Sequence, residues 1–318
     1  MRKIYLILAI AGIMMTTACS NENNEPVIAT DEANVTFTVN LNDIDSRVIS
    51  DGNTVDQLVF AVFDTNGNEV TALRQNNVPV SNCHATVTSR VQLGRGFTFV
   101  FWAQKSGNTF YNTTNLKDVV VSYDGYANDE NRDAFTATYS IPKVTEDFTQ
   151  DVTLTRPFAQ VDYVCDVDDW EKVLNSTYGL NGSDFTVAAG AFTHLNLLTG
   201  EASHPTAVSL ARPQDNSFVS TTTKVSTSQY QHQGLFDNEK YWISMNYILA
   251  QKDVQTSLTD ATMKIYSTGR EDQLVENDIG PIELPIQRNH RTVVYIQDLT
   301  KVVKLEVTID PSFPHGDF

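Results

Sequence analysis

The chain has 318 residues, a length that suggests roughly two domains, and 41% of its residues are hydrophobic, which allows buried cores and argues against wholesale disorder. Asp and Glu number 39 against 22 Lys and Arg, so the formal net charge is −17. This charge would repel a phosphate backbone and disfavours nucleic-acid binding.

Residues 1–18 are typical of an export signal. A basic start at Arg2 and Lys3 is followed by an apolar run that is too short and wrongly flanked to span a membrane. The segment ends in Thr-Thr-Ala-Cys, which resembles the bacterial lipobox, where the cysteine is diacylated and becomes the first residue. We therefore predict lipidation at Cys19; ordinary signal cleavage beside an incidental cysteine is the alternative.

Residues 19–30 are predicted to form a flexible tether, because they are polar and have too little apolar surface to fold. Acidic residues soon after the lipidated cysteine resemble the surface-export signal of Bacteroidota lipoproteins. The expected location is therefore the outer membrane, with the chain exposed at the cell surface or in a fimbria.

Residues 31–150 are predicted to form a first β-domain, because apolar and polar residues alternate in several short runs. These runs are Val35–Leu41, Leu58–Phe63, Ala85–Leu93, Phe97–Trp102 and Val119–Tyr123. The alternating phenylalanines of the fourth run are expected to fill one core face, a ligand-stacking platform being the alternative. After the second run, Asn66-Gly67 predicts a hairpin turn, since both residues tolerate positive φ. A calcium loop that includes Asp64 is the alternative, but the EF-hand spacing fails.

An acidic loop follows from Asp124 to Asp133, with Asp129 and Glu130 between them. Several carboxylates on one loop are compatible with a cation site. A solvated loop is the more usual structure for such a run of charges.

The stretch Val152–Val164 is predicted to join two domains. The pair Arg156-Pro157 interrupts the strand pattern, and Phe158 begins a new strand-like run. Proline lacks an N–H and fits the first residue of a strand or an edge. We place the start of a second domain, residues 151–318, at this stretch; a bulge within one large domain is the alternative.

The second domain is predicted to be a β-sandwich with one short helix. Asp168 and Asp169 precede the helical run Trp170–Leu174, where carboxylates would satisfy free N–H groups and the helix dipole. Strand-like runs follow at Phe192–Leu198, Tyr241–Leu249, Ala261–Tyr266, Ile282–Ile286, Thr292–Ile296 and Val302–Ile309. Short strands with turn signals between them predict a sandwich, so the fold class is all-β.

The sequence shows no catalytic or metal-binding constellation. It has no glycine-rich phosphate loop, no His-Glu-x-x-His and no Gly-x-Ser-x-Gly, so neither an enzyme nor a cofactor is predicted. Cys83 and Cys165 lie in different predicted domains and are expected to be free thiols. His290 lies in the basic cluster 288–291, which could bind an anion such as a carboxylated glycan; a turn with solvated charges is the alternative.

Several stretches, in this order along the chain, resemble the fimbrillin-like lipoproteins of Bacteroidales, the family of type V pilus subunits and their relatives. They are Ser46-Arg47 with Ile49–Gly52, Leu58–Asp64 with Asn66-Gly67, Arg132–Phe135, Arg156–Val161, Pro285–Thr292 with Leu299-Thr300, and Ile309–Phe313. The resemblance implies two tandem transthyretin-like antiparallel β-sandwich domains and export as a lipoprotein.

The resemblance also implies assembly by strand exchange after a trypsin-like protease cuts behind an arginine. Arg47 occupies the matching place, between the first two strand-like runs; an ordinary exposed loop residue is the alternative. Cutting there would release the first strand and open a groove that a neighbour's strand could fill by backbone hydrogen bonds and alternate side-chain pockets. The candidate donor is Val302–Ile309, with Val303, Leu305, Val307 and Ile309 at its alternate positions.

The sequence therefore predicts a non-catalytic cell-surface lipoprotein, a fimbrial or fimbria-like structural subunit that assembles by strand exchange and contributes to adhesion. The expected partners are other copies or homologous pilus subunits, the outer membrane through the lipid anchor, and ligands on host or bacterial surfaces. No nucleic acid, cofactor or metal is expected. The alternative is a monomeric, surface-exposed glycan- or protein-binding module.

Overall fold

The structure is a computed structural model that describes residues 31–41, 52–125, 127–174, 182–212, 223–225, 240–266, 279–297, 299 and 305–310. The described elements from Glu32 onward belong to one structural unit. They are almost all strands, which confirms the predicted all-β sandwich fold. Within these residues no helix is long and apolar enough to cross a bilayer.

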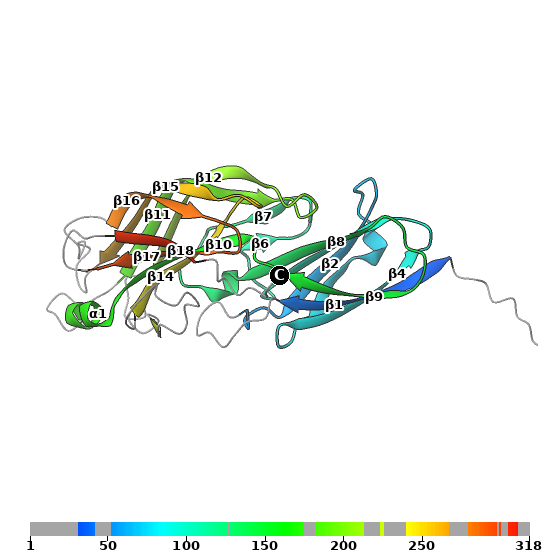
Figure 1. The fold of residues 1–318 in the computed structure, drawn as a ribbon, viewed down its shortest axis with the longest axis horizontal. Coiled ribbons are helices and arrows are strands. Elements are labelled where there is room, and N and C mark those ends of the chain that lie inside the picture. Colours follow the sequence, from blue (N-terminus) through cyan, green and yellow to red (C-terminus); the bar gives the residue numbers. More distant parts are fainter. Residues whose placement is uncertain are drawn as a thin grey trace, which may run out of the picture. The chain divides into compact units, whose positions relative to one another are not determined.

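A first sandwich contains two sheets that face each other (Figure 1). One sheet has the order β4-β1-β9, formed by β4 (His84–Gln92), β1 (Glu32–Leu41) and β9 (Phe148–Leu154). The other has the order β3-β2-β5-β8, formed by β3 (Gln75–Pro79), β2 (Gln57–Asp64), β5 (Phe97–Gln104) and β8 (Ala134–Ile141). Alternate residues of β1 and β4 are buried, as expected for strands that cover a core with one face.

The core of the first sandwich is built on aromatic rings. The Phe37 side chain is fully buried, and its ring centroid lies 4.7 Å from that of Phe99 and 5.2 Å from that of Phe101. Phe97 is also buried and contacts Phe99. The alternating phenylalanines of β5 therefore fill the core, as predicted, because tilted and edge-on ring pairs pack densely between two sheets.

The predicted turn after β2 is confirmed. Gly67 has a φ of +75°, and the Asp64 carboxylate accepts hydrogen bonds from the backbone N–H groups of Asn66 and Asn68, each 2.8 Å long. The hydrogen bond from the backbone N–H of Asn68 is one cause that lowers the pKa of Asp64. This carboxylate is thus used to hold the turn, and a short 3₁₀ turn, η1 (Thr71–Leu73), then leads to β3.

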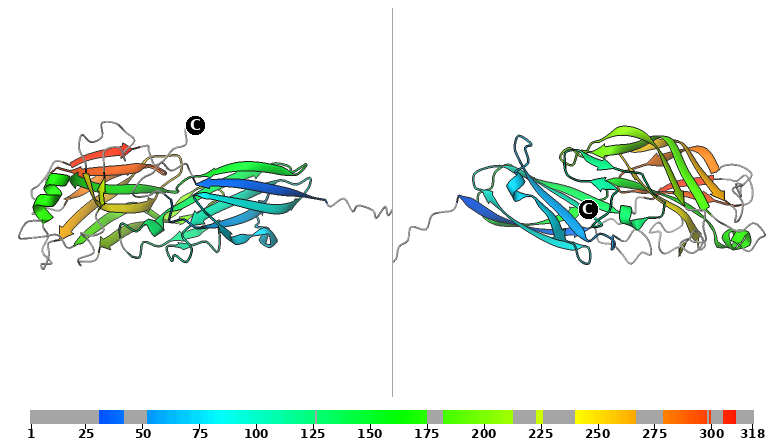
Figure 2. Two further views of the ribbon diagram at one scale, coloured as in Figure 1. Left: turned by 90° about the horizontal axis from the view of Figure 1, so that it is seen from below. Right: turned by 180° about the vertical axis from the view of Figure 1, so that it is seen from behind.

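A second sandwich follows from β10 onward. Its first sheet has the order β13-β14-β10-β17-β18, formed by β13 (Thr223–Val225), β14 (Lys240–Leu249), β10 (Phe158–Asp166), β17 (Arg291–Ile296) and β18 (Leu305–Asp310). Its second sheet contains β16 (Ile279–Ile286), β15 (Thr256–Tyr266), β11 (Gly182–Leu195) and β12 (Ala202–Arg212). The predicted short helix is present as α1 (Val167–Leu174), which follows β10 at one end of this sandwich (Figure 2).

The two sandwiches have the same strand connections. In chain order, β1, β2, β3, β4, β5, β8 and β9 correspond to β10, β11, β12, β14, β15, β16 and β17. β1 pairs antiparallel with β4 and parallel with β9, and β10 pairs in the same way with β14 and β17. β2 lies between β3 and β5 with β8 beyond, and β11 lies between β12 and β15 with β16 beyond. The chain therefore contains a structural repeat.

Additional strands distinguish the two halves of the repeat. A long insertion between β5 and β8 forms β6 (Tyr111–Asn112), β7 (Val119–Val121) and the 3₁₀ turn η2 (Glu130–Arg132). β7 pairs with the end of β11, so this insertion joins a sheet of the second sandwich. β13 and β18 flank the second sandwich and have no equivalents among the described strands of the first.

Candidate functional site

The predicted donor strand forms an edge strand of the second sandwich. β18 pairs antiparallel with β17, with Val307 opposite Val294 and Ile309 opposite Thr292. Val307 packs against the core of this sandwich, yet both Val307 and Ile309 stay half-buried. Leu305 begins the strand, whereas Val303 lies outside the described residues. A strand with one paired edge and incompletely buried side chains is held by fewer contacts than a central strand.

Two other predicted site residues cannot be located in the same way. Cys19, the predicted lipidation site, and Arg47, the predicted processing site, both lie outside the described residues. Arg47 does fall between the end of β1 at Leu41 and the start of β2 at Gln57. Their roles therefore remain predictions.

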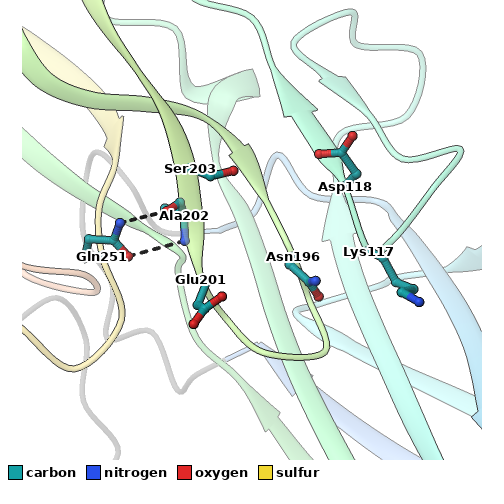
Figure 3. Close-up of a pocket in the computed structure, with 7 residues that line it drawn as sticks. All are labelled: Lys117, Asp118, Asn196, Glu201, Ala202, Ser203 and Gln251. Atoms are coloured by element: carbon teal, nitrogen blue, oxygen red, sulfur yellow. Dashed lines mark hydrogen bonds between the residues drawn. The ribbon is translucent and has the colours of Figure 1, made fainter. Parts of the chain in front are cut away.

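A polar pocket of about 350 Å³ lies where the insertion meets the second sandwich. It is lined by Lys117, Asp118, Asn196, Glu201, Ala202, Ser203 and Gln251. Figure 3 shows the β11–β12 hairpin between Gln251 on one side and the β7 end of the insertion, with Lys117 and Asp118, on the other. Three chain segments thus converge on this pocket.

Hydrogen bonds fix the walls of the pocket. The Gln251 side-chain amide accepts from the N–H of Ala202 at 3.3 Å and donates to its carbonyl at 2.7 Å (Figure 3). The Asn196 side-chain oxygen accepts from the N–H groups of Leu198 and Thr199, which closes the tight β11–β12 turn. These bonds hold the backbone and leave the exposed Glu201 and Asp118 side chains directed away from the core.

The pocket can bind a polar ligand by hydrogen bonds. Carboxylate and amide oxygens accept, and a lysine ammonium and a serine hydroxyl donate, so groups that both donate and accept can be matched there. Ser203 is hydrogen-bonded to His204 Nδ1 at 3.1 Å, and the His204 ring lies 3.9 Å from the His194 ring. Sequence analysis missed this pocket, because its residues come from turns that are distant in sequence.

The loop at residues 124–133 is solvated only in part, because Asp124 is exposed and Asp129 and Glu130 are half-buried, whereas its end is packed. Arg132 is buried and donates to the carbonyl oxygens of Ser122 and Asp124, and Asp133 is buried and paired with Arg156. Asp129 accepts from the N–H of Asn131 and caps η2. No group of metal-ligating side chains is present among the described residues. The loop instead forms part of the packed insertion.

The pair Arg156–Asp133 connects the predicted hinge to the insertion. Arg156 donates from Nε and Nη2 to the two oxygens of Asp133, both at 2.6 Å, and the two side chains are 0% and 1% exposed. The guanidinium also lies 4.3 Å from the centre of the Phe135 ring. A bidentate buried pair fixes the mutual orientation of its two segments, so the Arg156-Pro157 break is a packed junction.

The basic cluster 288–291 forms the predicted turn into β17, but its charges are only partly solvated. The backbone N–H of His290 donates to the carbonyl of Gln287 at 3.1 Å, and Arg288 is half-buried. Arg288 donates to the carbonyl of Ala250 at 2.7 Å, and burial lowers its pKa to about 10. Arg291 is fully buried beside Asp162, with 3.0 Å between Nε and Oδ2. These partners come from β10 and from the residue after β14, so local composition did not reveal them.

Both cysteines in the described part of the chain are free thiols, as predicted. Cys165 is buried on β10, and burial raises the pKa of its thiol well above the usual value. Cys83 is half-buried between β3 and β4.

The chain belongs to the family described as "Family of unknown function (DUF6562)", whose model matches residues 26–317. No curated protein matches the chain. Solved structures with a similar fold include the tip fimbrial protein Mfa3 from Porphyromonas gingivalis, with 14% identity, coverage of 88% of this chain and 99% of that chain, and a TM-score of 0.45.

Two further structures are similar at the same level. The fimbrial anchor protein Mfa2 from Porphyromonas gingivalis has 11% identity, coverage of 90% and 100%, and a TM-score of 0.43. A fimbrial assembly protein from Parabacteroides distasonis has 11% identity, coverage of 88% and 99%, and a TM-score of 0.43. The function proposed below is therefore argued from the residues of this chain.

Proposed function

We propose that this protein is a non-catalytic lipoprotein of the cell surface, anchored through Cys19, that acts as a fimbrial or fimbria-like structural subunit and contributes to adhesion. Its partners are other copies of the chain or homologous subunits, and it assembles by strand exchange. The two domains of the proposal are residues 31–150 and 151–318.

The observation that supports this role is the edge position of β18. A strand that pairs along one edge can leave its sheet without changing the order of the other strands. Its alternation of Val307 and Ile309 with polar residues suits a groove with alternate apolar pockets. The position of Arg47 between β1 and β2 provides the matching acceptor, because a cut there separates β1 from the rest of the chain.

Limited trypsin treatment of the full chain tests this proposal. We expect wild type to lose residues through Arg47, as measured by mass spectrometry, and then to form a ladder of oligomers on unheated gels. The variant Arg47→Ala should gain no oligomers on the same treatment. Arg90→Ala is the matched control, since Arg90 is 58% exposed in a surface pair with Glu32, and it should behave as wild type. An equal trypsin-dependent gain of oligomers in Arg47→Ala, or no gain in wild type, contradicts the proposal.

The polar pocket favours a second candidate function, a monomeric surface module that binds a glycan. Sugar hydroxyls both donate and accept, and the exposed carboxylates of Asp118 and Glu201 flank the pocket opening. We expect Glu201→Gln to weaken glycan binding about tenfold or more, because a hydrogen bond to a charged group contributes about 1.5–3 kcal/mol. Glu171→Gln on α1, an exposed glutamate away from the pocket residues, is the control. Glycan-array screening followed by calorimetry supplies the measurement, and equal binding by both variants rejects this function.

A further inference from the structure

The side of the first sandwich formed by β8 and β9 is open, whereas the equivalent side of the second sandwich is closed. β8 and β9 are each the last strand of their sheet. Among the described residues, backbone hydrogen bonds join them at one end, where Thr136 and Thr155 exchange two bonds of 2.8 and 3.0 Å, and the Tyr139 and Phe148 rings contact each other towards the other end. Along the rest of β9, no described strand pairs with its outer edge. We call the strip between these two strands the β8–β9 seam.

Apolar side chains in this seam are incompletely buried. On β8, Ala137, Tyr139 and Ile141 pack against the core but stay half-buried, and Phe148 of β9 does the same. Gln150 is also half-buried, in the row of β9 that faces the core. Burial of apolar surface contributes about 25 cal/mol per Å² to the stability of the fold. Side chains that stay partly in water therefore contribute less than they would if they were fully buried.

In the second sandwich most of the equivalent residues are buried. Leu284 and Ile286 of β16 are each 0% exposed, as is Val294 of β17, whereas Ile282 stays half-buried. The difference follows from β18, which pairs with β17 and also contacts β16. One extra strand thus covers the side of the second sandwich that is left open in the first.

We propose that the outer edge of β9 is an acceptor for β18 of a second copy of this chain, which pairs antiparallel to it as β18 pairs with β17. The structural repeat supports this choice, because β9 and β17 occupy equivalent positions and β18 already fits one of them. The inference deepens the proposed function and rests on it for the donor strand. It differs in the acceptor, because the outer edge of β9 is available without removal of β1.

The register of the pairing follows from the repeat. The core-facing residues of β17 are Thr292 and Val294, and those at the centre of β9 are Gln150 and Val152. Within its own chain, Val307 of β18 lies opposite Val294 of β17. In the partner chain, it should therefore lie opposite the central part of β9. Val307 and Ile309, which are half-buried in their own chain, would then cover the half-buried rings of the seam.

Disulfide capture tests the proposal on the full chain in an Arg47→Ala background, so that cleavage plays no part. One protein carries Gln150→Cys and the other carries Val307→Cys; the two are unfolded in urea and refolded together, so that slow release of β18 cannot hide the exchange. Directly opposed residues of antiparallel strands lie about 4.5–5.5 Å apart at Cα, within the range of about 4.4–6.8 Å that a disulfide spans. We expect a disulfide-linked dimer that neither protein gives alone, with positions 150 and 307 joined in peptide mass spectra. The unsubstituted protein, which has three cysteines, supplies the baseline.

Thr149→Cys replaces Gln150→Cys in the matched control, because Thr149 is exposed on the other face of β9. It should give no dimer with Val307→Cys. Absence of the 150–307 link, or equal linking in the control, overturns the proposal. Dimers of Gln150→Cys alone would show β9 pairing with a second β9 and would also overturn it. Because this background lacks Arg47, cleavage behind Arg47 takes no part in the test. If the 150–307 link does not form, the proposed assembly after trypsin cleavage is not contradicted. If assembly after cleavage fails, pairing of β18 with the outer edge of β9 is not contradicted.

Discussion

The two sandwiches have the same strand order, but they are stabilised in different ways. The first has a core of phenylalanine rings around Phe37 and an open seam at β8 and β9. The second has a covered edge and an apolar core that includes Tyr163 and Val294. On the opposite face of the same sheet, it buries Gln160, Asp162 and Arg291 at 0% exposure. A shared topology therefore does not dictate what surrounds each sheet, because the outer face of β10 and β17 carries buried polar groups that must remain paired.

The largest expected effect breaks the buried ion pair on the outer face of the β10–β17 sheet. Asp162→Ala leaves the Arg291 guanidinium buried without its carboxylate, and removal of one partner of a buried ion pair costs about 3–5 kcal/mol. We expect the free energy of unfolding, measured by urea titration, to fall by this amount. Asp56→Ala is the control, because its pair with Lys105 is partly exposed and such pairs contribute about 0–1 kcal/mol. Similar losses of unfolding free energy in both variants would show that the buried pair stabilises the fold no more than the partly exposed pair.

The next prediction compares the open and closed sides directly. Ile286→Ala in β16 removes a fully buried side chain and should cost about 2–5 kcal/mol through lost burial and a cavity. Ile141→Ala in β8 removes a half-buried side chain and should cost clearly less in the monomer. Chemical unfolding of both variants at one temperature gives the comparison. If Ile141→Ala costs as much as Ile286→Ala, the seam is closed in solution.

A smaller effect concerns the bulge in β11, where the register shifts between Val187 and Ala191. Gly190 has a φ of +101°, and a Cβ there would lie 2.2 Å from the carbonyl oxygen of Ser257. Gly190→Ala should therefore cost more than backbone strain alone, which is about 1–3 kcal/mol. Gly94→Ala in the first sandwich is the control, because Gly94 has a φ of +79° with nothing within 4 Å of the new Cβ. Thermal unfolding distinguishes them, and equal losses would contradict the close approach.

The smallest effect is a pH dependence in the first sandwich. The backbone N–H of Asn34 at the start of β1 donates to Asp147 at 2.8 Å and lowers the pKa of this carboxyl from its usual 3.8. A depressed pKa in the folded state stabilises the fold above pH 3.8, and this stabilisation disappears as the pH falls through the lower pKa. Asp147→Asn should thus be slightly less stable than wild type at neutral pH, and the difference should vanish in acid. Urea midpoints across this range supply the measurement; a constant difference would reject the linkage.

The sequence predicted several elements of each sandwich with little help from context. The runs at Val35–Leu41 and Phe97–Trp102 became β1 and β5, and Trp170–Leu174 lies within α1. β12 was missed, since Pro205 interrupts a run that has polar residues on an exposed face, and only its pairing with β11 makes it a strand. β8 was missed although Phe135, Ala137, Tyr139 and Ile141 alternate with polar residues along it.

The candidate sites depended far more on tertiary contacts. The polar pocket combines Asp118 of the insertion, Glu201 of a hairpin and Gln251 beyond β14, and no local pattern links these positions. The basic cluster shows a related case: its local composition predicted a turn with solvated charges or an anion site, and the turn is present, but Asp162 and the Ala250 carbonyl hold its two arginines.

By itself, the sequence determined the fold class and the turn at Asn66-Gly67, because strand periodicity and turn chemistry act between near neighbours. Only the tertiary structure decided which edges are covered, which charges are buried and which turns meet. These features arise from pairings between residues distant in sequence, from Arg156 with Asp133, 23 positions apart, to the still more distant Asp162 and Arg291, for which local composition carries no signal.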